Sequence, residues 1–413
     1  MEVTMVGIDL AKNVFCLHGC DANGKPVLRK QLLRRQLLSF VANLPRCLVA
    51  MEACASARYW AREIEKLGHQ VRLIAPRFVR PFVKANKNDA SDAEAICEAA
   101  SRPTMRFVTV KSTAQQDVQA VHRVRQQLVK TRTALVNQVR GLLAEYGIVI
   151  GRGFAPLRRA LPLILEDRDN GLSGVMRELL GEIGERLKFI EQRLRQYDLT
   201  IQRLFRQDER CQRVAAVEGV GPLTATALVA AVGNATDFKS GRELAAYLGL
   251  VPRHRASGGR TVLLGISKRG NRYLRTLLIH GARSALYRIE RQRGARAMWA
   301  ARLKLRRGSN VAAVALANKN ARVLWALLHR HQSYRPAPFP GGPHSGLTSS
   351  TALRTAGPPQ TMAAGAVHGA AVSAPESITL SGPPSEQQLE GGAGKLVSEQ
   401  CQDRTSVEAK PVN

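Results

Sequence analysis

The sequence predicts an α/β domain built on a mixed sheet, followed by a chain that is mostly helical. Through residues 1–110, short apolar runs alternate with amphipathic segments, the pattern of a sheet covered by helices. Later apolar positions recur at helical spacing, and the chain ends in an aperiodic stretch rich in Pro, Gly, Ser and Ala. We therefore expect a sheet domain at 1–110, a helical linker and oligomerisation region at 111–210, a mostly helical C-terminal domain at 211–332, and a disordered low-complexity tail at 333–413.

Apolar runs and turn signals place the elements of the first segment. The runs TMVGIDL, NVFCLHG and PVLRKQL are typical of three successive antiparallel strands, and Asp21-Ala22-Asn23-Gly24 between the last two predicts a hairpin turn. Next come a helix around 34–44, a strand at 47–52, a helix ending at Gly68, and a strand at 70–76. Antiparallel strands followed by alternating helices and strands indicate a mixed sheet with helices over it.

The middle segment has the periodicity of long helices. Apolar residues from Met176 to Leu204 are spaced alternately four and three apart, which is a heptad seam. A looser seam runs from Val118 to Leu142, and Arg125 and Arg132 interrupt it. Glycines and prolines within 147–174 separate the two helices. The pattern fits either an antiparallel hairpin or a dimerising coiled coil.

Charge is the unusual feature of the composition. The 413 residues include 62 Lys and Arg against 32 Asp and Glu, a formal net charge of +30. Such an excess favours a polyanionic partner, most often nucleic acid, although a solubilising surface would also carry it. An anionic membrane is a weaker option, because the sequence has no basic amphipathic anchor and the apolar stretch at 223–233 is too short to span a bilayer.

The cysteines indicate a reducing compartment. Seven of them are scattered without the paired spacing of a zinc site. We expect reduced thiols that mostly fill the core of a cytosolic protein. The N-terminus also lacks the pattern of a signal peptide.

Two carboxylates stand at the tips of predicted buried strands. Asp9 follows the apolar run of the first strand, and Glu52 ends the fourth. Strand ends are where a mixed sheet presents side chains to a cleft. If these two strands are neighbours, their carboxylates converge.

Two further carboxylates open a predicted helix. Asp89 and Asp92 are three residues apart, so they share one helix face. Taken singly, Asp89 is explained as a helix N-cap, Asp92 as a first-turn acid, and Glu52 as the opening of the next helix. Four acids in one cleft of a basic protein instead favour a divalent cation. Hard oxygen ligands at the ends of separate elements suit Mg²⁺ and phosphoryl transfer.

The motifs GIDLAK, MEA and KNDASDAEAI resemble the N-terminal domain of the DEDD transposases of the insertion-sequence-110 family. That domain is similar to the RuvC, or Holliday-junction resolvase, version of the RNase H fold. The resemblance implies that Asp9, Glu52, Asp89 and Asp92 bind divalent metal at a catalytic centre. Lys12, just beyond the first strand, has the right charge to meet a phosphate.

The C-terminal segment opens with a glycine turn before a helix. Gly219-Val220-Gly221-Pro222 and the apolar run after it fit a helix-hairpin-helix, in which Gly219 and Gly221 let the backbone approach a phosphate. An ordinary Gly-Pro helix break explains the same residues.

A serine then stands among arginines in what we expect to be a flexible loop. Ser257 precedes Gly258-Gly259, with Arg253, Arg255 and Arg260 nearby. It could be an ordinary polar loop residue, or a nucleophile toward a phosphodiester whose charge the guanidinium groups stabilise. His254 is the only near candidate for a base.

The stretch YLGLVP…ASGG…GISKRGNRYLRTLL closely resembles the second domain of the same transposases. In that family the matching serine forms a covalent phosphoserine bond with DNA, which implies this role for Ser257 and ranks Ser267 second. The resemblance implies contacts to the nucleic-acid backbone from Lys268, Arg269, Asn271 and Arg275; for the two basic residues, a solvated turn is the alternative.

The resemblance covers about residues 3–100 and 211–330. It implies a magnesium-dependent, site-specific DNA recombinase of an insertion sequence, acting on the element ends and the target duplex in the bacterial cytosol. It also implies a guide RNA. The heptad helices suit a homodimer or tetramer, and our hypothesis is one composite site of the acidic cluster and Ser257 to which different subunits could contribute. Two alternatives remain: a metal-dependent junction nuclease without a covalent step, and a non-catalytic nucleic-acid-binding protein.

Overall fold

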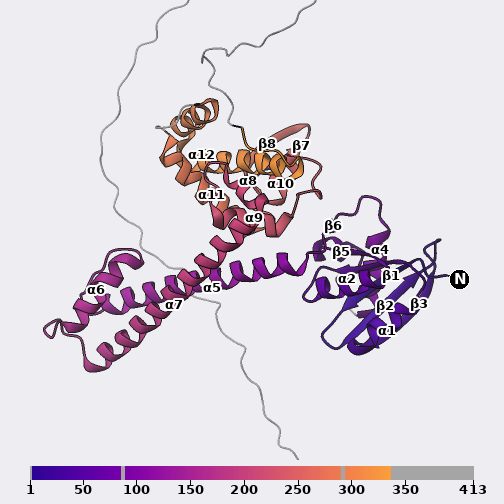
Figure 1. Ribbon diagram of the computed structural model, residues 1–413, viewed down its shortest axis with the longest axis horizontal. Coiled ribbons are helices and arrows are strands. Elements are labelled where there is room, and N and C mark those ends of the chain that lie inside the picture. Colours follow the sequence, from indigo (N-terminus) through magenta and orange to yellow (C-terminus); the bar gives the residue numbers. More distant parts are fainter. Residues whose placement is uncertain (1, 85–88, 290–293, 336–413) are drawn as a thin grey trace, which may run out of the picture. The chain divides into compact units, whose positions relative to one another are not determined.

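The computed structural model describes residues 2–84, 89–289 and 294–335 (Figure 1). The predicted disordered tail at 333–413 lies almost wholly outside the described residues. Within them, a sheet domain comes first, two long helices follow, and a largely helical domain comes last. The sequence prediction of a mixed sheet followed by helices is confirmed.

The N-terminal sheet has six strands in the order β3-β2-β1-β4-β5-β6. The first three strands are antiparallel, whereas β4 pairs in parallel with β1 and with β5. The two-residue strand β6, which is antiparallel to β5, was not predicted, because so short a strand leaves no periodicity. The strands are β1 (Met5–Leu10), β2 (Val14–Cys20), β3 (Pro26–Leu33), β4 (Leu48–Glu52), β5 (Gln70–Ile74) and β6 (Phe107–Val108).

Helices cover both faces of this sheet. Val6 and Ile8 of β1 pack into one core with Trp60 and Ile64 of α2 (Ala57–Lys66), which α1 (Leu37–Ala42) completes. The residues that point the other way belong to a second core with α4 (Asp89–Ser101). Short turns of helix fill the connections, namely η1 (Arg34–Gln36), α3 (Pro76–Val79) and η2 (Arg80–Phe82). Because β1 and β4 are buried on both faces, their sequences are continuously apolar.

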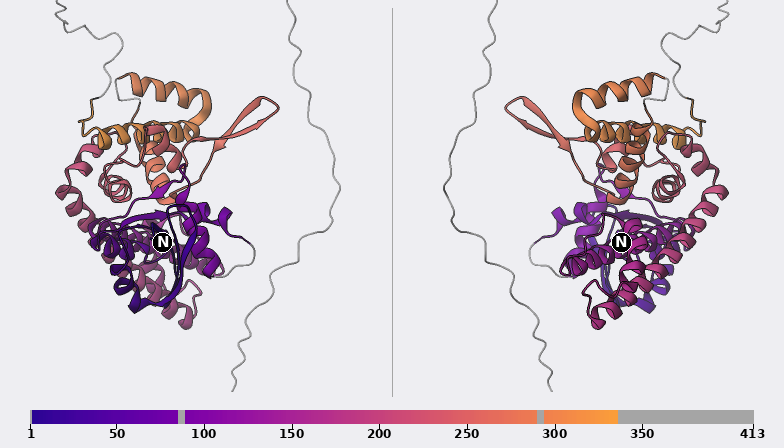
Figure 2. Two further views of the ribbon diagram at one scale, coloured as in Figure 1. Left: turned by 90° about the vertical axis from the view of Figure 1, so that its right-hand side faces the viewer. Right: turned by 90° about the vertical axis from the view of Figure 1, so that its left-hand side faces the viewer.

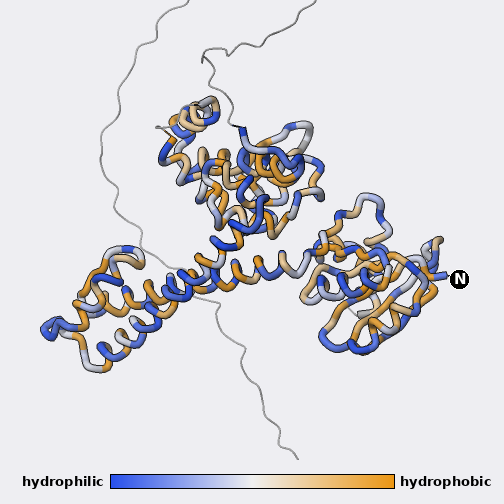
Figure 3. Tube along the Cα trace, viewed as in Figure 1, coloured by the Kyte–Doolittle hydropathy of each residue, from blue (hydrophilic) through white to orange (hydrophobic). Residues whose placement is uncertain are grey.

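The middle segment is an antiparallel pair of helices, α5 (Thr113–Ala144) and α7 (Gly174–Gln207), with α6 (Phe154–Glu166) between them in the chain (Figure 1). Apolar and polar residues alternate along both long helices (Figure 3). The heptad seam of α7 packs from Met176 to Leu194 into one core with apolar residues of α5 and α6, inside a single chain.

The two arginines that interrupt the seam of α5 fix its register against α7. Arg125 Nε lies 2.6 Å from Asp198 Oδ1, and Arg132 pairs with Glu191. Arg132 comes seven residues after Arg125, whereas its partner Glu191 comes seven residues before Asp198, the partner of Arg125. Antiparallel helices require this opposite order. Of the two arrangements that the sequence allowed, the structure contains the hairpin.

The C-terminal domain is helical apart from one two-stranded sheet. Its helices enclose a single core that includes Leu228, Leu278, Leu316 and Leu324. Strands β7 and β8 extend beyond the helices as a narrow ribbon (Figure 2). The elements are α8 (Glu209–Ala215), α9 (Pro222–Val232), α10 (Gly241–Tyr247), β7 (Pro252–Ser257), β8 (Arg260–Ile266), α11 (Arg272–Tyr287) and α12 (Ala295–His329).

The last helix deviates from a single straight rod. Gly308 has φ +79°, so α12 consists of two helices joined at a kink. By length and composition α12 would reach across a membrane, and half of its apolar window is buried inside the protein. Its second half supplies Ala313, Leu316 and Leu324 to the domain core, as expected for a core helix.

A buried histidine joins the helical hairpin to the C-terminal domain. The ring nitrogens of His122 on α5 lie 3.0 Å from the hydroxyl of Tyr273 on α11 and 3.0 Å from that of Thr226 on α9. Burial first, and then the charge of Arg125, lower the pKa of His122 to about 4. The imidazole is therefore neutral where three helices meet.

We expect acid to destabilise this junction. Between pH 6.5 and 4 the unfolded chain binds a proton at His122 that the folded protein does not. As the pH is lowered through this range, the free energy of unfolding should therefore decrease by up to about 3 kcal/mol. In urea unfolding, His122→Gln should lose this component, and His280→Gln, at an exposed position, should retain it. Parallel pH profiles for wild type and His122→Gln would contradict the assignment.

Candidate active site and nucleic-acid interface

Asp9 and Glu52 lie at the same end of two neighbouring strands. Strands β1 and β4 are parallel, and their last paired residues are Ile8 and Met51, so each carboxylate comes directly after that pair. Both acidic residues are half-buried, whereas Ile8 and Met51 are fully buried. The condition on which the sequence argument depended, adjacency of the first and fourth strands, is confirmed.

Both carboxylates affect the pKa of a nearby thiol. Cys54, two residues after β4, has a raised pKa; burial is the main cause, and the charges of Glu52 and then Asp9 add to it. Both acids are thus close enough to Cys54 to act on the same group.

Helix α4 brings its first turn toward this end of the sheet. A Cβ at Gly7 would lie 2.4 Å from Ala93 O, so α4 contacts the backbone of β1 directly. One turn further on, Cys97 Sγ lies 3.5 Å from the sulfur of Cys20, which pairs with Met5. The helix therefore runs antiparallel to β1, and its N-terminus continues from Gly7 in the direction of Asp9.

The structure places the other predicted metal ligands less completely. Asp89 begins α4, and its side chain lies outside the described part of the protein; Asp92 is half-buried in the first turn. Among the described side chains, no three His, Cys, Asp or Glu residues gather as metal ligands, so Asp92 does not complete such a group with Asp9 and Glu52. The four-carboxylate site stays a prediction. Lys12 is exposed just beyond β1, as expected.

Ser257 ends a β-strand, and the expectation of a flexible loop here is wrong. Strands β7 and β8 are joined by Gly258 and Gly259, whose φ angles of +55° and +75° make the tight turn that matches the twist of a hairpin. In the register, Ser257 stands opposite Arg260. The signal was present in the sequence as two glycines before a β-branched run.

Basic residues follow this ribbon. Arg253 and Arg255 alternate with His254 along β7, so the two arginines belong to one face of the strand and His254 to the other, while the side chain of Ser257 lies outside the described part of the protein. All three side chains, and that of Arg260, are exposed.

The base of the hairpin is held by two close glycine contacts. A Cβ at Gly249 would lie 2.0 Å from Arg269 O, and one at Gly270 would lie 1.8 Å from Tyr247 O. Both glycines have positive φ, so the two turns fit together only without side chains.

Two of the predicted nucleic-acid ligands have structural partners at this base. Arg275 is buried, and its Nη1 donates to Leu248 O at 3.1 Å and to Arg269 O at 3.3 Å. Asn271 caps α11 by accepting from Leu274 N. Lys268 and Arg269 are exposed in the turn between the hairpin and α11. Arg275 and Asn271 therefore position the turn that presents the other two.

The glycine turn before α9 also has a packing reason. Gly219 has φ +81°, and a Cβ there would lie 2.5 Å from Gly281 O on α11. Around Gly221 the space is open. Helices α8 and α9 flank the turn in the order of a helix-hairpin-helix; its phosphate contact stays a prediction.

Comparison with known proteins identifies the family. Residues 6–148 match a family model described as a transposase, and residues 211–298 match the model of the transposase IS116/IS110/IS902 family. The chain belongs to this family of transposases. It is 53% identical over 337 residues to a probable family 20 transposase of Pseudomonas aeruginosa, covering 81% of this chain and the whole of that protein.

Two further relatives are named as transposases of insertion sequences. The transposase for IS1111A of Coxiella burnetii is 46% identical over 81% of this chain and 92% of its own length. The transposase for IS1328 of Yersinia enterocolitica is 44% identical over 79% of this chain and 97% of its own length. Members of this family are DNA transposases, so the enzyme class expected from the motifs is confirmed.

Sequence reasoning missed two polar residues inside α12 of this transposase. Asn318 Nδ2 donates to Leu250 O, just before the hairpin, and Asn320 Nδ2 donates to Glu218 O, in the glycine turn. Asn320 is fully buried. A pair of asparagines within an apolar helical run was the available signal.

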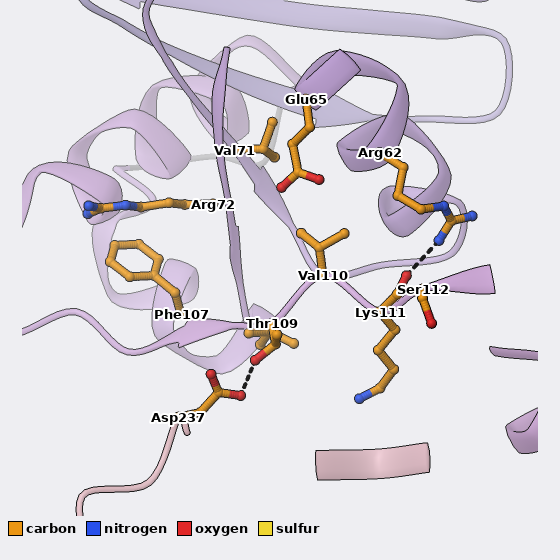
Figure 4. Close-up of a pocket in the computed structure, with 11 residues that line it drawn as sticks. Arg62, Glu65, Val71, Arg72, Phe107, Thr109, Val110, Lys111, Ser112 and Asp237 are labelled. Carbon is orange, nitrogen blue, oxygen red and sulfur yellow. Dashed lines mark hydrogen bonds between the residues drawn. The ribbon is translucent and has the colours of Figure 1, made fainter. Parts of the chain in front are cut away.

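A hollow of about 650 Å³ beside β5 and β6 holds none of the predicted site residues (Figure 4). Its polar groups are engaged with one another: Thr109 donates to the carboxylate of Asp237, and Arg62 donates to Lys111 O. Lys111 Nζ donates to Ala231 O at the end of α9, and burial above all lowers its pKa to about 8. The hollow is therefore part of the contact between the first 112 residues of the transposase and its C-terminal domain.

We expect Gly7→Ala to disturb the candidate active site from a distance. Its methyl group would press on backbone atoms of α4, so the unfolding free energy should fall by about 1–3 kcal/mol and DNA processing should weaken as the helix shifts. Gly141→Ala on α5, where the surrounding space is open, is the matched control and should be neutral or stabilising. Denaturant unfolding of both variants measures the difference. Wild-type stability in Gly7→Ala would contradict the close contact.

Proposed function

We propose that this chain is a site-specific DNA recombinase of an insertion sequence, which cuts and rejoins strands through a serine nucleophile assisted by divalent metal. The observation that carries the proposal is the pair of carboxylates, Asp9 and Glu52, at adjacent ends of two buried parallel strands. Membership of a transposase family supports duplex DNA as the substrate.

The donor set fits magnesium. Asp9 and Glu52 are hard oxygen ligands on rigid strands, both acting on Cys54, and α4 directs its acidic first turn toward them. Asp9, Glu52, Asp89 and Asp92 would hold the ion. When bound, it would neutralise the acids and polarise the scissile phosphate as a Lewis acid.

Ser257 is the proposed nucleophile. Its oxygen forms a bond to phosphorus while the bond to one DNA oxygen breaks, and the serine proton leaves to a base. The phosphoserine bond then keeps the energy of the phosphodiester for rejoining. Arg255 and Arg260 would stabilise the negative charge of the pentacovalent state.

The domain limits fit this division of labour. We propose 1–110 as the catalytic RuvC-like domain, 111–210 as the linker and oligomerisation region, and 211–332 as the domain of the serine. The bounds of α5 and α7 support the two internal limits. Val175, Phe189 and Leu199 of α7 are 78%, 59% and 70% exposed, which supports a homodimer or tetramer through this hairpin.

A guide RNA and a bacterial cytosolic location complete the proposal. The net charge of +30 exceeds what contact with one duplex requires, so a second polyanion is a natural partner. Reduced cysteines are in keeping with the cytosol; the six in the described part of the chain are free thiols.

Ser257→Ala separates the recombinase from a junction nuclease. We expect the variant to lose strand exchange and the DNA-linked polypeptide seen on a denaturing gel, because no other hydroxyl replaces the nucleophile. Ser267→Ala, at the second-ranked serine, is the control and should keep both. Continued cutting by Ser257→Ala would establish hydrolysis without a covalent step.

Asp9→Asn and Glu52→Gln test the metal site. Each removes a charge from the strand ends, so DNA cleavage should fall by ~10³-fold or more, since metal assistance contributes several kcal/mol to the transition state. Manganese affinity, measured by calorimetry, should fall in parallel. Glu63→Gln, whose carboxylate pairs with Lys66 on the surface, should leave both unchanged. A wild type that binds DNA but never cuts it would support the non-catalytic alternative.

A further inference from the structure

The C-terminal domain contains a second basic site, away from the serine hairpin. A hollow of about 1030 Å³ lies between the start of α10, the second half of α12 and residues 332–335; we call it the α10–α12 pocket. Gly241 makes the contact between these helices possible, because a Cβ there would lie 2.8 Å from the Cα and O atoms of Arg322. The pocket is therefore formed by a tight backbone contact.

Its walls are strongly and one-sidedly charged. Five basic residues line the pocket, and no acidic residue is among its lining residues in the described part of the chain. None of the five forms an ion pair within that part. The basic residues are Arg242, Lys319, Arg322, Arg330 and Arg335.

The charges repel one another, and the described residues supply no counter-ion to them. Burial lowers the pKa of Lys319, and the neighbouring charges of Arg296 and Arg322 lower it further. Lys319 Nζ lies 4.2 Å from the ring centroid of Trp299. This cation–π contact stabilises the ammonium charge less than a carboxylate would.

Arg296 adds donors that the protein does not satisfy. Its Nη1 donates to the hydroxyl of Tyr334, which lines the pocket, at 3.0 Å. Its Nε and Nη2 are buried and have no hydrogen-bond partner. Buried guanidinium donors without partners are costly, and an anion is the group that relieves them.

We propose that the α10–α12 pocket binds the phosphate backbone of a DNA strand, as a contact separate from the Ser257 hairpin and the Gly219 turn. Convergent cations and the partly exposed aromatic residues Trp325 and Tyr334 form the kind of surface that binds phosphates and sugars, and Arg296 adds positive charge behind it through its hydrogen bond to Tyr334. Among polyanions, DNA is favoured because the family consists of DNA transposases.

One turn of α12 connects this pocket to the two other predicted contacts. Lys319 lies between Asn318, which holds Leu250 before the hairpin, and Asn320, which holds Glu218 in the glycine turn. A strand seated in the pocket is therefore bound by the same rigid helix that supports both contacts, and the pocket would orient DNA relative to Ser257.

The test is the salt dependence of binding by the full-length double variant Lys319→Gln/Arg322→Gln. Fluorescence anisotropy with a labelled duplex, without divalent metal, keeps the result independent of cleavage chemistry. The logarithm of the binding constant falls linearly with the logarithm of the salt concentration. Loss of two phosphate contacts should make this negative slope shallower by about 1–2 and weaken binding roughly ten-fold at physiological salt. The control Arg302→Gln/Arg306→Gln removes the same charge from exposed positions in the first half of α12, before the kink at Gly308, and should keep the wild-type slope.

A second double variant, Arg242→Gln/Arg330→Gln, removes charge from other parts of the pocket wall and repeats the test should the first fail to fold. An equal change in the control would overturn the proposal, because it would mean diffuse attraction to the whole surface. An unchanged slope in both pocket variants would overturn it as well. Weakened binding of a labelled RNA strand, or of inorganic phosphate alone, with duplex binding intact would overturn the assignment to DNA.

Discussion

The parallel pairing of β1 with β4 is the constraint from which the rest of the N-terminal domain follows. Both strands are buried on both faces, with Val6, Ile8, Val49 and Met51 fully removed from solvent. Hydrophobic burial therefore fixes their register strongly. A fixed register places the two acidic residues at the same end of neighbouring strands, because each follows the last paired residue of its strand. The buried middles of the strands stabilise the fold, and their ends carry the acidic residues Asp9 and Glu52.

The C-terminal domain holds its exposed hairpin in place by a different kind of contact. Its hairpin is exposed along nearly its whole length, and an isolated two-stranded ribbon has little stability of its own. The base of the hairpin makes it rigid. There, Gly249 and Gly270 allow two turns to pack closely, and the Arg275 guanidinium donates to a carbonyl of each turn, Leu248 O and Arg269 O. An exposed ribbon on a rigid base can enter a nucleic-acid groove without losing its position.

Local patterns in the sequence predicted the local structure, and contacts between distant segments escaped prediction. Apolar runs gave β1 to β5 in order, and the seam of α7 was recognised, although the seam could not say whether its partner was α5 or another chain. The serine segment was expected to be a loop, because its exposed arginines hid the alternation of a strand. Asp9 and Glu52 were predicted to converge from strand ends alone, whereas Arg275 resembled a surface ligand and is buried.

The basic pocket shows why charge is harder to interpret from sequence than apolar periodicity. Its cations come from segments as far apart as Arg242 and Arg335, so no motif contains them. Their proximity depends on the contact of Gly241 with Arg322. Nothing in the sequence distinguishes this glycine as one that makes a close helix contact. The asparagines on either side of Lys319 reach the residue before the hairpin and the glycine turn from one helical turn, so two segments far apart in the chain share one rigid support. Displacing that turn of α12 would therefore move the hairpin and the glycine turn together, because the same helix holds both.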